Sequence, residues 1–232
     1  MPSQKDSRIE DFAYSYLQSY YLKKNKGKNI YVFKAAQTKQ GAEVDGLFTF
    51  LSTGNQLYTA SLNTRCSTKV TGLLNSYKKN GLSKWRYATS ILISAIIFFL
   101  LFQIINFYIA AIIALSVAIG TFFVHSILEN RYKINVLKDI VTKMKNRMPA
   151  DEKWVGLSMS SLSFRKNMLA DVFLKLCEEN GLGVITVGQR AKVVLKQEPK
   201  QEKCPSGDFL SYYNLESAVR TAVLTNTVLK VA

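Results

Sequence analysis

Residues 87–128 read YATSILISAIIFFLLFQIINFYIAAIIALSVAIGTFFVHSIL, and no Lys, Arg, Asp or Glu interrupts them. An α-helix rises about 1.5 Å per residue, so this stretch corresponds to roughly 60 Å of helix. The hydrocarbon core of a bilayer is about 30 Å thick, so the length is too great for one crossing and suits two. A buried helical pair inside a soluble domain is the alternative, but apolar character on all faces disfavours it. We therefore predict a transmembrane hairpin, with helices over about 87–105 and 107–128 and a turn near Gln103–Asn106.

Basic residues flank this apolar stretch on both sides; they are Lys78, Lys79, Lys84 and Arg86 before it, and Arg131, Lys133 and Lys138 after it. Cytoplasmic loops carry an excess of Lys and Arg, so we expect a two-pass protein with both termini and the soluble part in the cytoplasm. The whole chain has 31 basic and 16 acidic residues, a formal net charge of +15. This excess favours an anionic partner, which is either nucleic acid or the anionic surface of a lipid bilayer.

Several classes of chemistry find no support in the sequence. Cys66, Cys177 and Cys204 are scattered and lack the spacing of a zinc site or a disulfide framework. The single histidine, His125, lies inside the second apolar helix, so nucleophilic catalysis of the Ser–His–Asp or Cys–His kind is not indicated. Neither a Walker A motif nor GxGxxG is present, so no nucleotide cofactor is expected.

The rest of the chain alternates between helical and strand patterns. We expect helices over 7–23, 68–77, from the end of the apolar stretch to about 148, over 164–180 and over 215–231. We expect strands over 30–34, 42–51, 56–62, 153–159, 183–187 and 191–196, with turns at 52–55 and 188–190. The segment 35–41 has the composition of a polar connection, and 197–208 has that of a linker.

The two soluble parts, 1–84 and 130–200, are each small for an independent domain. We therefore expect them to complete one mixed α/β domain together, with a central sheet flanked by helices and the hairpin 87–128 as an insertion. Residues 201–232 are expected to add a linker and a C-terminal helix outside this domain.

Two carboxylates in the strand 42–51 are candidates for a functional site. Side chains alternate along a strand, so Glu43 and Asp45 share one face while Val44 and Gly46 share the other. Two interpretations are open: this face of the strand is exposed to solvent, or the pair has a chemical role.

The order of these elements resembles the restriction-endonuclease-like fold of the PD-(D/E)xK nuclease superfamily. The sequence GAEVDG at 41–46 resembles the strand whose Asp holds the catalytic metal, and QLYTASL at 56–62 takes the place of the ExK strand. The sequence CEENGLGVI at 177–185 is similar to the helix, glycine and strand that end many of these domains. Glu10 lies where many members carry an additional acidic residue. The resemblance covers the soluble part of the chain without its C-terminal tail.

The resemblance implies hydrolysis of a phosphodiester with Mg²⁺ as cofactor. Two carboxylates hold the cation, and a nearby lysine positions the attacking water and stabilises the developing charge. Asp45 matches the first carboxylate. The second strand should read acid-x-lysine, and it carries Thr59-Ala60-Ser61 at the matched position.

Two explanations of this departure are open. The site has migrated, with Asp45 and Glu43 or Glu10 as its carboxylates and Arg65 or Lys69 as its cation. Alternatively, the domain keeps the fold without catalysis. The second is favoured because both the carboxylate and the lysine are missing from one strand, and whether the chain is an enzyme stays open.

We therefore expect a membrane-anchored cytosolic protein whose nuclease-like, non-catalytic domain binds nucleic acid or a protein at the membrane surface. The expected contacts to nucleic acid or lipid are Lys23, Lys24, Lys26, Lys28, Arg65 and Lys69. One alternative is a membrane-tethered, Mg²⁺-dependent DNA endonuclease. Another is an accessory subunit of a membrane protein complex, or a homo-oligomer. The small residues Ala110, Ala111, Ala114, Ala118 and Gly120 permit close packing with another helix, but they suit packing within the hairpin equally well, and this use is favoured.

Overall fold

The computed structural model describes residues 4–25, 29–51, 56–188, 192–205 and 207–225, with side chains described from Glu10 onwards. Its contacts divide the chain into two compact units. One unit combines Met1–Asn75 with Leu137–Ala232, and the other is Ser76–Val136. Each unit is described below by itself.

A six-stranded mixed sheet forms the centre of the first unit. The strands are β1 (Tyr31–Gln37), β2 (Glu43–Leu51), β3 (Leu57–Asn63), β4 (Glu152–Leu157), β5 (Leu182–Val187) and β6 (Val193–Gln197), and they lie in this order across the sheet. β2 pairs antiparallel with β1 and β3, β4 pairs parallel with β3 and β5, and β6 closes the sheet antiparallel to β5. The prediction of a mixed α/β arrangement is confirmed, since strands from both sides of the apolar stretch pair directly.

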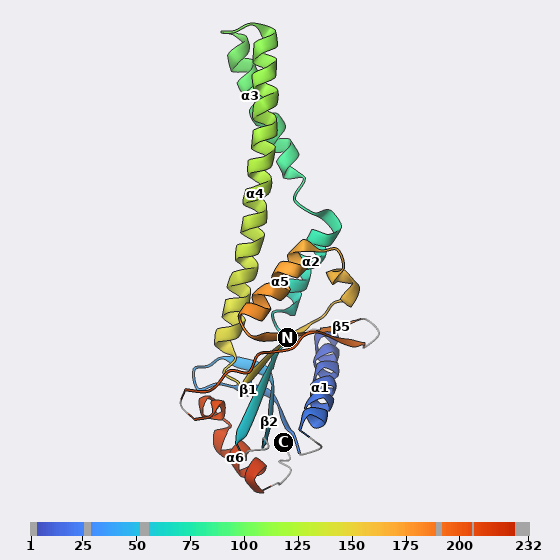
Figure 1. The fold of residues 1–232 in the computed structure, drawn as a ribbon, viewed down its shortest axis with the longest axis vertical. Coiled ribbons are helices and arrows are strands. Elements are labelled where there is room, and N and C mark those ends of the chain that lie inside the picture. Colours follow the sequence, from blue (N-terminus) through green and yellow to red (C-terminus); the bar gives the residue numbers. More distant parts are fainter. Residues whose placement is uncertain (1–3, 26–28, 52–55, 189–191, 206, 226–232) are drawn as a thin grey trace. The chain divides into compact units, whose positions relative to one another are not determined.

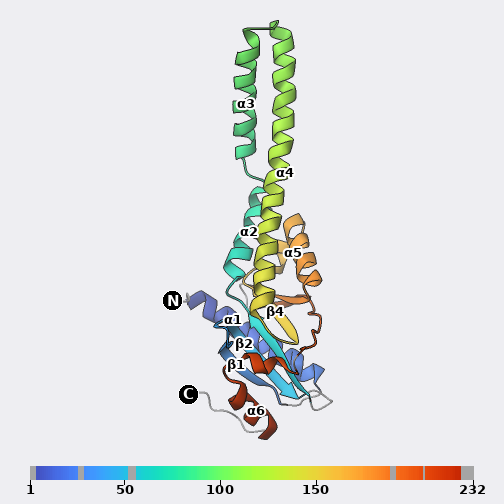
Figure 2. The same ribbon diagram turned by 90° about the vertical axis from the view of Figure 1, so that its left-hand side faces the viewer.

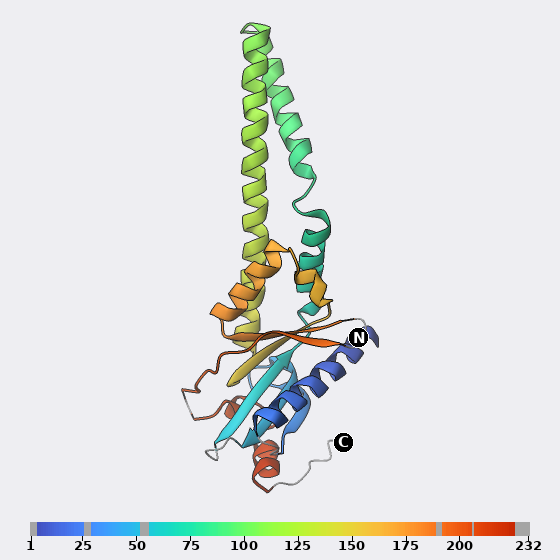
Figure 3. The same cartoon turned by 45° about the vertical axis from the view of Figure 1, so that its right-hand side comes forward.

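Helix α1 (Gln4–Lys24) covers one face of this sheet. Its buried residues pack with alternate side chains of four strands; the cluster contains Ala13, Tyr14, Leu17, Tyr21, Phe48, Phe50, Ala60, Leu62, Trp154, Ile185 and Val187. Figure 3 shows α1 crossing the sheet on the side opposite to α5 (Met168–Glu179). The helical spacing of apolar residues in 7–23 therefore marks a face that packs on the sheet.

The other face is covered by α5, by α2 (Ser67–Asn80) and by the C-terminal part of α4 (Phe107–Arg147). Their buried side chains include Val70, Leu74, Leu137, Val141, Met144, Leu169, Phe173 and Cys177. The Asn167 amide caps α5 by accepting a hydrogen bond from Ala170 N, and it also donates to Leu74 O of α2 at 3.0 Å. One side chain therefore begins α5 and ties it to α2.

Several boundaries differ from the prediction. β1 continues through the expected polar connection, because Ala36 and Gln37 pair with β2. α5 begins at Met168 instead of 164, because Ser161–Phe164 form a short 3₁₀ turn, η1, before the cap. β4 ends at Leu157, two residues before the predicted end. Residues 52–55 and 189–190 of the two predicted turns lie outside the described residues.

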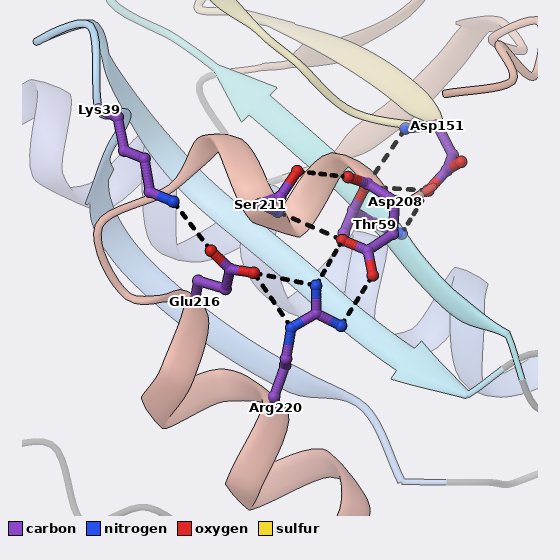
Figure 4. A network of polar contacts seen from close by, with 7 residues as sticks. All are labelled: Lys39, Thr59, Asp151, Asp208, Ser211, Glu216 and Arg220. Carbon is purple, nitrogen blue, oxygen red and sulfur yellow. Dashed lines mark hydrogen bonds and ion pairs between the residues drawn. The ribbon is translucent and has the colours of Figure 1, made fainter. Parts of the chain in front are cut away.

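The C-terminal segment belongs to the first unit. It forms the 3₁₀ turn η2 (Phe209–Tyr212) and helix α6 (Glu216–Thr225), and residues 226–231 of the predicted helix lie outside the described residues. Tyr213 is fully buried, and its hydroxyl donates to Pro149 O at 2.8 Å. Figure 4 shows the polar contacts of this segment, in which ion pairs join Lys39 to Glu216 and Arg220 to Asp208 and Glu216. The segment that was expected to be a linker and a separate helix therefore packs against the sheet.

The second unit holds two long apolar helices, α3 (Trp85–Phe102) and the first part of α4. They lie antiparallel and side by side, joined by a turn at residues 103–106 as predicted. Both are long and apolar enough to span a membrane. Ala110 and Ala114 are buried between them, and Thr89 Oγ1 lies 3.3 Å from His125 Nδ1. The outer faces are apolar and exposed; they include Ile91, Phe99, Ile112, Leu115 and Phe123.

Candidate functional site

The candidate site lies where β2 begins and β3 ends. The antiparallel register pairs Gly46 with Leu62, so Asp45 lies beside Asn63, the last residue of β3. Thr64 and Arg65 follow directly and lead into α2. The site is therefore built from the ends of two neighbouring strands and the connection to the next helix.

The Asp45 carboxylate is buried and fully engaged in hydrogen bonds. Its Oδ2 accepts from Thr64 N at 2.6 Å, from Thr64 Oγ1 at 3.0 Å and from Arg65 N at 3.2 Å. Its Oδ1 accepts from Arg65 Nε at 2.7 Å. The backbone carbonyl of Asp45 accepts from the Tyr14 hydroxyl of α1. Since two of these donors are backbone amides, the main chain after β3 fixes the orientation of the carboxylate.

Arg65 bridges Asp45 and Glu43. Its Nη1 donates to Glu43 Oε2 at 2.6 Å while its Nε binds Asp45. The hydrogen bond from Arg65 lowers the pKa of Glu43, and the same contact raises the pKa of Arg65 further above its ordinary value. The two candidate carboxylates of β2 therefore share one guanidinium group.

Glu10 enters the site from α1 through a shared hydroxyl. Thr64 Oγ1 lies 3.2 Å from Glu10 Oε1 and 3.0 Å from Asp45 Oδ2. A hydroxyl has one proton, so it donates to only one of these oxygens. Burial and then the charge of Asp45 raise the pKa of Glu10. Thr64 Oγ1 therefore lies between the Glu10 and Asp45 carboxylates and is within donating distance of both.

The structure brings together four of the predicted site residues, which are Glu10, Glu43, Asp45 and Arg65. Lys69 lies exposed in the first turn of α2, close to Cys66 and outside the carboxylate network. The predicted lysines of α1 lie far from the site, because Glu10 and Lys24 are separated by about 20 Å of helix.

Lys23 and Lys24 lie at the C-terminal end of α1, and Lys26 and Lys28 are outside the described residues. Lys24 Nζ lies 2.5 Å from Oε1 of Glu152, a residue of β4 that is only 3 % exposed. Lys24 is therefore half of an ion pair and not a free cation.

Sequence reasoning named Arg65 as a possible cation of this site, but it missed Thr64 as a partner of Asp45 and Asn63 as its neighbour on β3. It placed the comparison at Thr59-Ala60-Ser61, but Thr59 pairs with Thr49 and its hydroxyl lies 2.9 Å from Asp151 Oδ2. A signal was present, since Asp45 and Asn63 lie at equal distances in sequence from position 54, the midpoint between β2 and β3. The residues beside and after this position of β3 read Asn63-Thr64-Arg65.

A second polar cluster, also missed, joins α1 to β4. The buried Glu152 accepts from the Tyr21 hydroxyl, and Trp154 Nε1 donates to that same hydroxyl at 2.7 Å. Burial and then the charge of Glu152 raise the pKa of the neighbouring Tyr20 to about 12. Each polar group of this cluster has a partner, so its arrangement is that of a structural contact.

The described residues do not fit a divalent cation. Within them, no group of three or more His, Cys, Asp or Glu side chains has the arrangement of a metal site. At Asp45 the contacts give the reason. Thr64 binds the carboxylate oxygen Oδ2, and Arg65 forms an ion pair with the other oxygen, Oδ1.

No protein-family model, curated protein or solved structure matches the chain.

Proposed function

We propose that the chain is a membrane-anchored protein whose restriction-endonuclease-like domain is non-catalytic and binds nucleic acid at the cytoplasmic surface of the membrane. The observation that carries this proposal is the ion pair between Arg65 and the buried Asp45, with Nε and Oδ1 2.7 Å apart. The fold, the charge around α2 and the apolar hairpin support its separate parts.

The nuclease-like fold is supported by strand order and direction. The three strands β1 to β3 form an antiparallel meander after α1, and β4 and β5 then add in parallel with helices between them. The carboxylate of GAEVDG lies on β2 next to the end of β3, where the resemblance requires a metal site.

The absence of catalysis is supported by the replaced side chains. Asn63 carries no negative charge, and Arg65 pairs with Asp45 where a nuclease of this superfamily would use both carboxylates to bind Mg²⁺. An arginine also stays protonated at any working pH, so it is a poor substitute for a lysine that helps to activate water. The endonuclease alternative therefore requires Arg65 to leave Asp45.

Nucleic-acid binding is supported by a basic patch at the start of α2, which consists of Arg65, Lys69 and Arg147. The positive charges of Arg147 and Lys69 oppose the burial that raises the pKa of Cys66, so both lie near this residue. All three side chains of the α2 basic patch are exposed, and Arg65 is at the same time the ion-pair partner of Asp45 and Glu43, so Lys69 and Arg147 are the cations that the proposal uses. Cations grouped around a helix N-terminus suit phosphate groups, which provide most of the affinity for nucleic acid.

Membrane anchoring is supported by the exposed apolar faces of α3 and α4. Ala110 and Ala114, which were considered as contacts to another subunit, are buried within the hairpin itself. Because two of the five small residues are buried in this way, we prefer the anchor role over that of an accessory subunit.

The test uses the full chain in nanodiscs of zwitterionic lipid, which removes anionic lipid as a competitor. We expect DNA binding at low salt that weakens steeply as salt rises. Lys69→Glu and Arg147→Glu should weaken binding at least tenfold, while Lys175→Glu on exposed α5 is the matched control for the charge change. No binding at low salt would refute the nucleic-acid part.

The non-catalytic part is tested by incubating the same sample with DNA and Mg²⁺ or Mn²⁺. We expect no cleavage above background. Cleavage that disappears in Asp45→Ala would show that the chain is the tethered endonuclease instead.

A further inference from the structure

Three carboxylates meet around the Thr64–Arg65 segment, and they come from two elements. Glu43 and Asp45 lie on β2, and Glu10 lies on α1. Arg65 forms ion pairs with two of them, and the third shares the Thr64 hydroxyl. Carboxylate oxygens are the ligands that hard divalent cations prefer, but within the described residues these three side chains do not have the arrangement of a metal site.

We infer that Arg65 is a built-in replacement for a divalent cation and keeps a carboxylate site closed to Mg²⁺. Its planar guanidinium presents two donors to two carboxylates at once, with Nε–Oδ1 at 2.7 Å and Nη1–Oε2 at 2.6 Å. A metal ion that bridges two carboxylates makes the same connection. The inference rests on the proposed loss of catalysis and gives its physical cause.

The Asp45 and Glu10 carboxylates have hydrogen bonds that do not involve the side chain of Arg65, whereas Glu43 is bound by that side chain. Asp45 Oδ2 is bound by the backbone amides of Thr64 and Arg65, and these bonds persist when the guanidinium is removed. Glu10 is held by the Thr64 hydroxyl. When the side chain of Arg65 is removed, Asp45 Oδ1 is therefore expected to lose its ion-pair partner while the backbone amides still hold the carboxylate in its orientation.

A buried amide lies at the neighbouring position of β3. Asn63 is 4 % exposed, and its Oδ1 has no hydrogen-bond partner within the described part of the chain. The register places Asn63 beside Asp45. Amide oxygens are accepted ligands of hard cations, so this atom complements the carboxylates.

The experiment measures cation binding by the full chain in nanodiscs. In the native protein we expect MgCl₂ and MnCl₂ to leave the Tm unchanged. In Arg65→Ala we expect a lower Tm without cation and a rise of about 3 °C when free cation is at about ten times its dissociation constant. Arg65→Gln, which keeps a hydrogen-bond donor but has no charge, provides a second variant if Arg65→Ala does not fold. Mn²⁺ binding is measured directly by electron paramagnetic resonance.

The double variant Asp45→Asn with Arg65→Ala is the control, and it should lose the response to cation. The inference is overturned if native protein binds Mn²⁺ through Asp45, or if neither Arg65 variant binds Mn²⁺ better than the double variant does. The proposed function fails on a different result, which is Mg²⁺-dependent cleavage of DNA by the native chain. A chain that cleaves nothing and whose Arg65 variants bind no cation would refute this inference alone.

Discussion

The ring of Tyr14 on α1 lies against the backbone of β2 at Gly46, where a Cβ atom would overlap with Tyr14 Cε1. The Tyr14 hydroxyl then donates to the carbonyl of Asp45, the neighbouring residue. Only a residue without a side chain permits this approach. The glycine of GAEVDG therefore allows α1 to pack on the strand that carries the candidate carboxylate.

Gly46→Ala should destabilise the protein by about 1–3 kcal/mol, because a buried ring must move or the helix must shift. Thermal unfolding of the full chain measures the effect as a lower Tm. The matched control is Gly72→Ala on α2, where a Cβ meets no atom within 4 Å. In that helix alanine is preferred over glycine by about 0.5–1 kcal/mol, so its Tm should rise. Equal effects at both positions would contradict the packing argument.

Tyr21→Phe should cost about 1–3 kcal/mol although it removes a single oxygen atom. The buried carboxylate of Glu152 loses the hydroxyl that donates to it, and Trp154 Nε1 loses its acceptor. Denaturant unfolding measures the change, and Tyr132→Phe on α4, where the side chain is 69 % exposed, is the control. If the two variants lose equal stability, the buried cluster contributes nothing specific.

Stability should depend on pH through Glu10. Burial, followed by the charge of Asp45, raises the pKa of Glu10 above its ordinary value of 4.5. The native state therefore binds the proton more tightly than the unfolded state does, and this contribution is complete below pH 4.5. It is lost as pH rises through the raised pKa and stays absent above it.

Comparing the native protein with Glu10→Gln between pH 4 and pH 7 isolates this contribution from those of all other groups. The stability of the native protein should fall relative to the variant as pH rises, and the difference should then level off. A difference that is constant over this range, or that changes in the opposite direction, would show that folding does not raise the pKa of Glu10.

Local sequence patterns predicted the helices and strands, whereas the contacts at the candidate site depend on how segments distant in sequence pair with one another. The apolar run at 87–128 and the alternation in 42–51 are properties of neighbouring residues, so the hairpin helices and β2 followed from sequence. The neighbours of Asp45 depend on the register of the β-hairpin formed by β2 and β3. The comparison with the nuclease motif assigned Thr59–Ser61 to this position, whereas the register places Asn63 there, with Thr64 and Arg65 after it.

The Glu152 cluster shows the same limit of sequence reasoning. Tyr21 and Glu152 are 131 positions apart, and nothing near either residue indicates the other. Lys24 looked like a free cation of a basic loop because its partner lies on a strand beyond the hairpin. The role of a charged residue can be assigned from sequence only when its ion-pair partner lies nearby in the sequence.

Substitutions of Tyr213 test whether the C-terminal segment is part of the folded core. Its side chain is fully buried and its hydroxyl donates to Pro149 O at 2.8 Å, whereas the ion pairs of Arg220 lie near the surface. Tyr213→Ala should therefore cost about 3–5 kcal/mol through the cavity it leaves, and Tyr213→Phe only about 1 kcal/mol for the hydrogen bond. Arg220→Ala should change the Tm little, because exposed ion pairs contribute little to stability. Hydrogen exchange of residues 208–225 distinguishes a detached segment from a destabilised domain. If Tyr213→Ala and Arg220→Ala leave the Tm equally unchanged, the segment is an appendage and the sheet is stable without it.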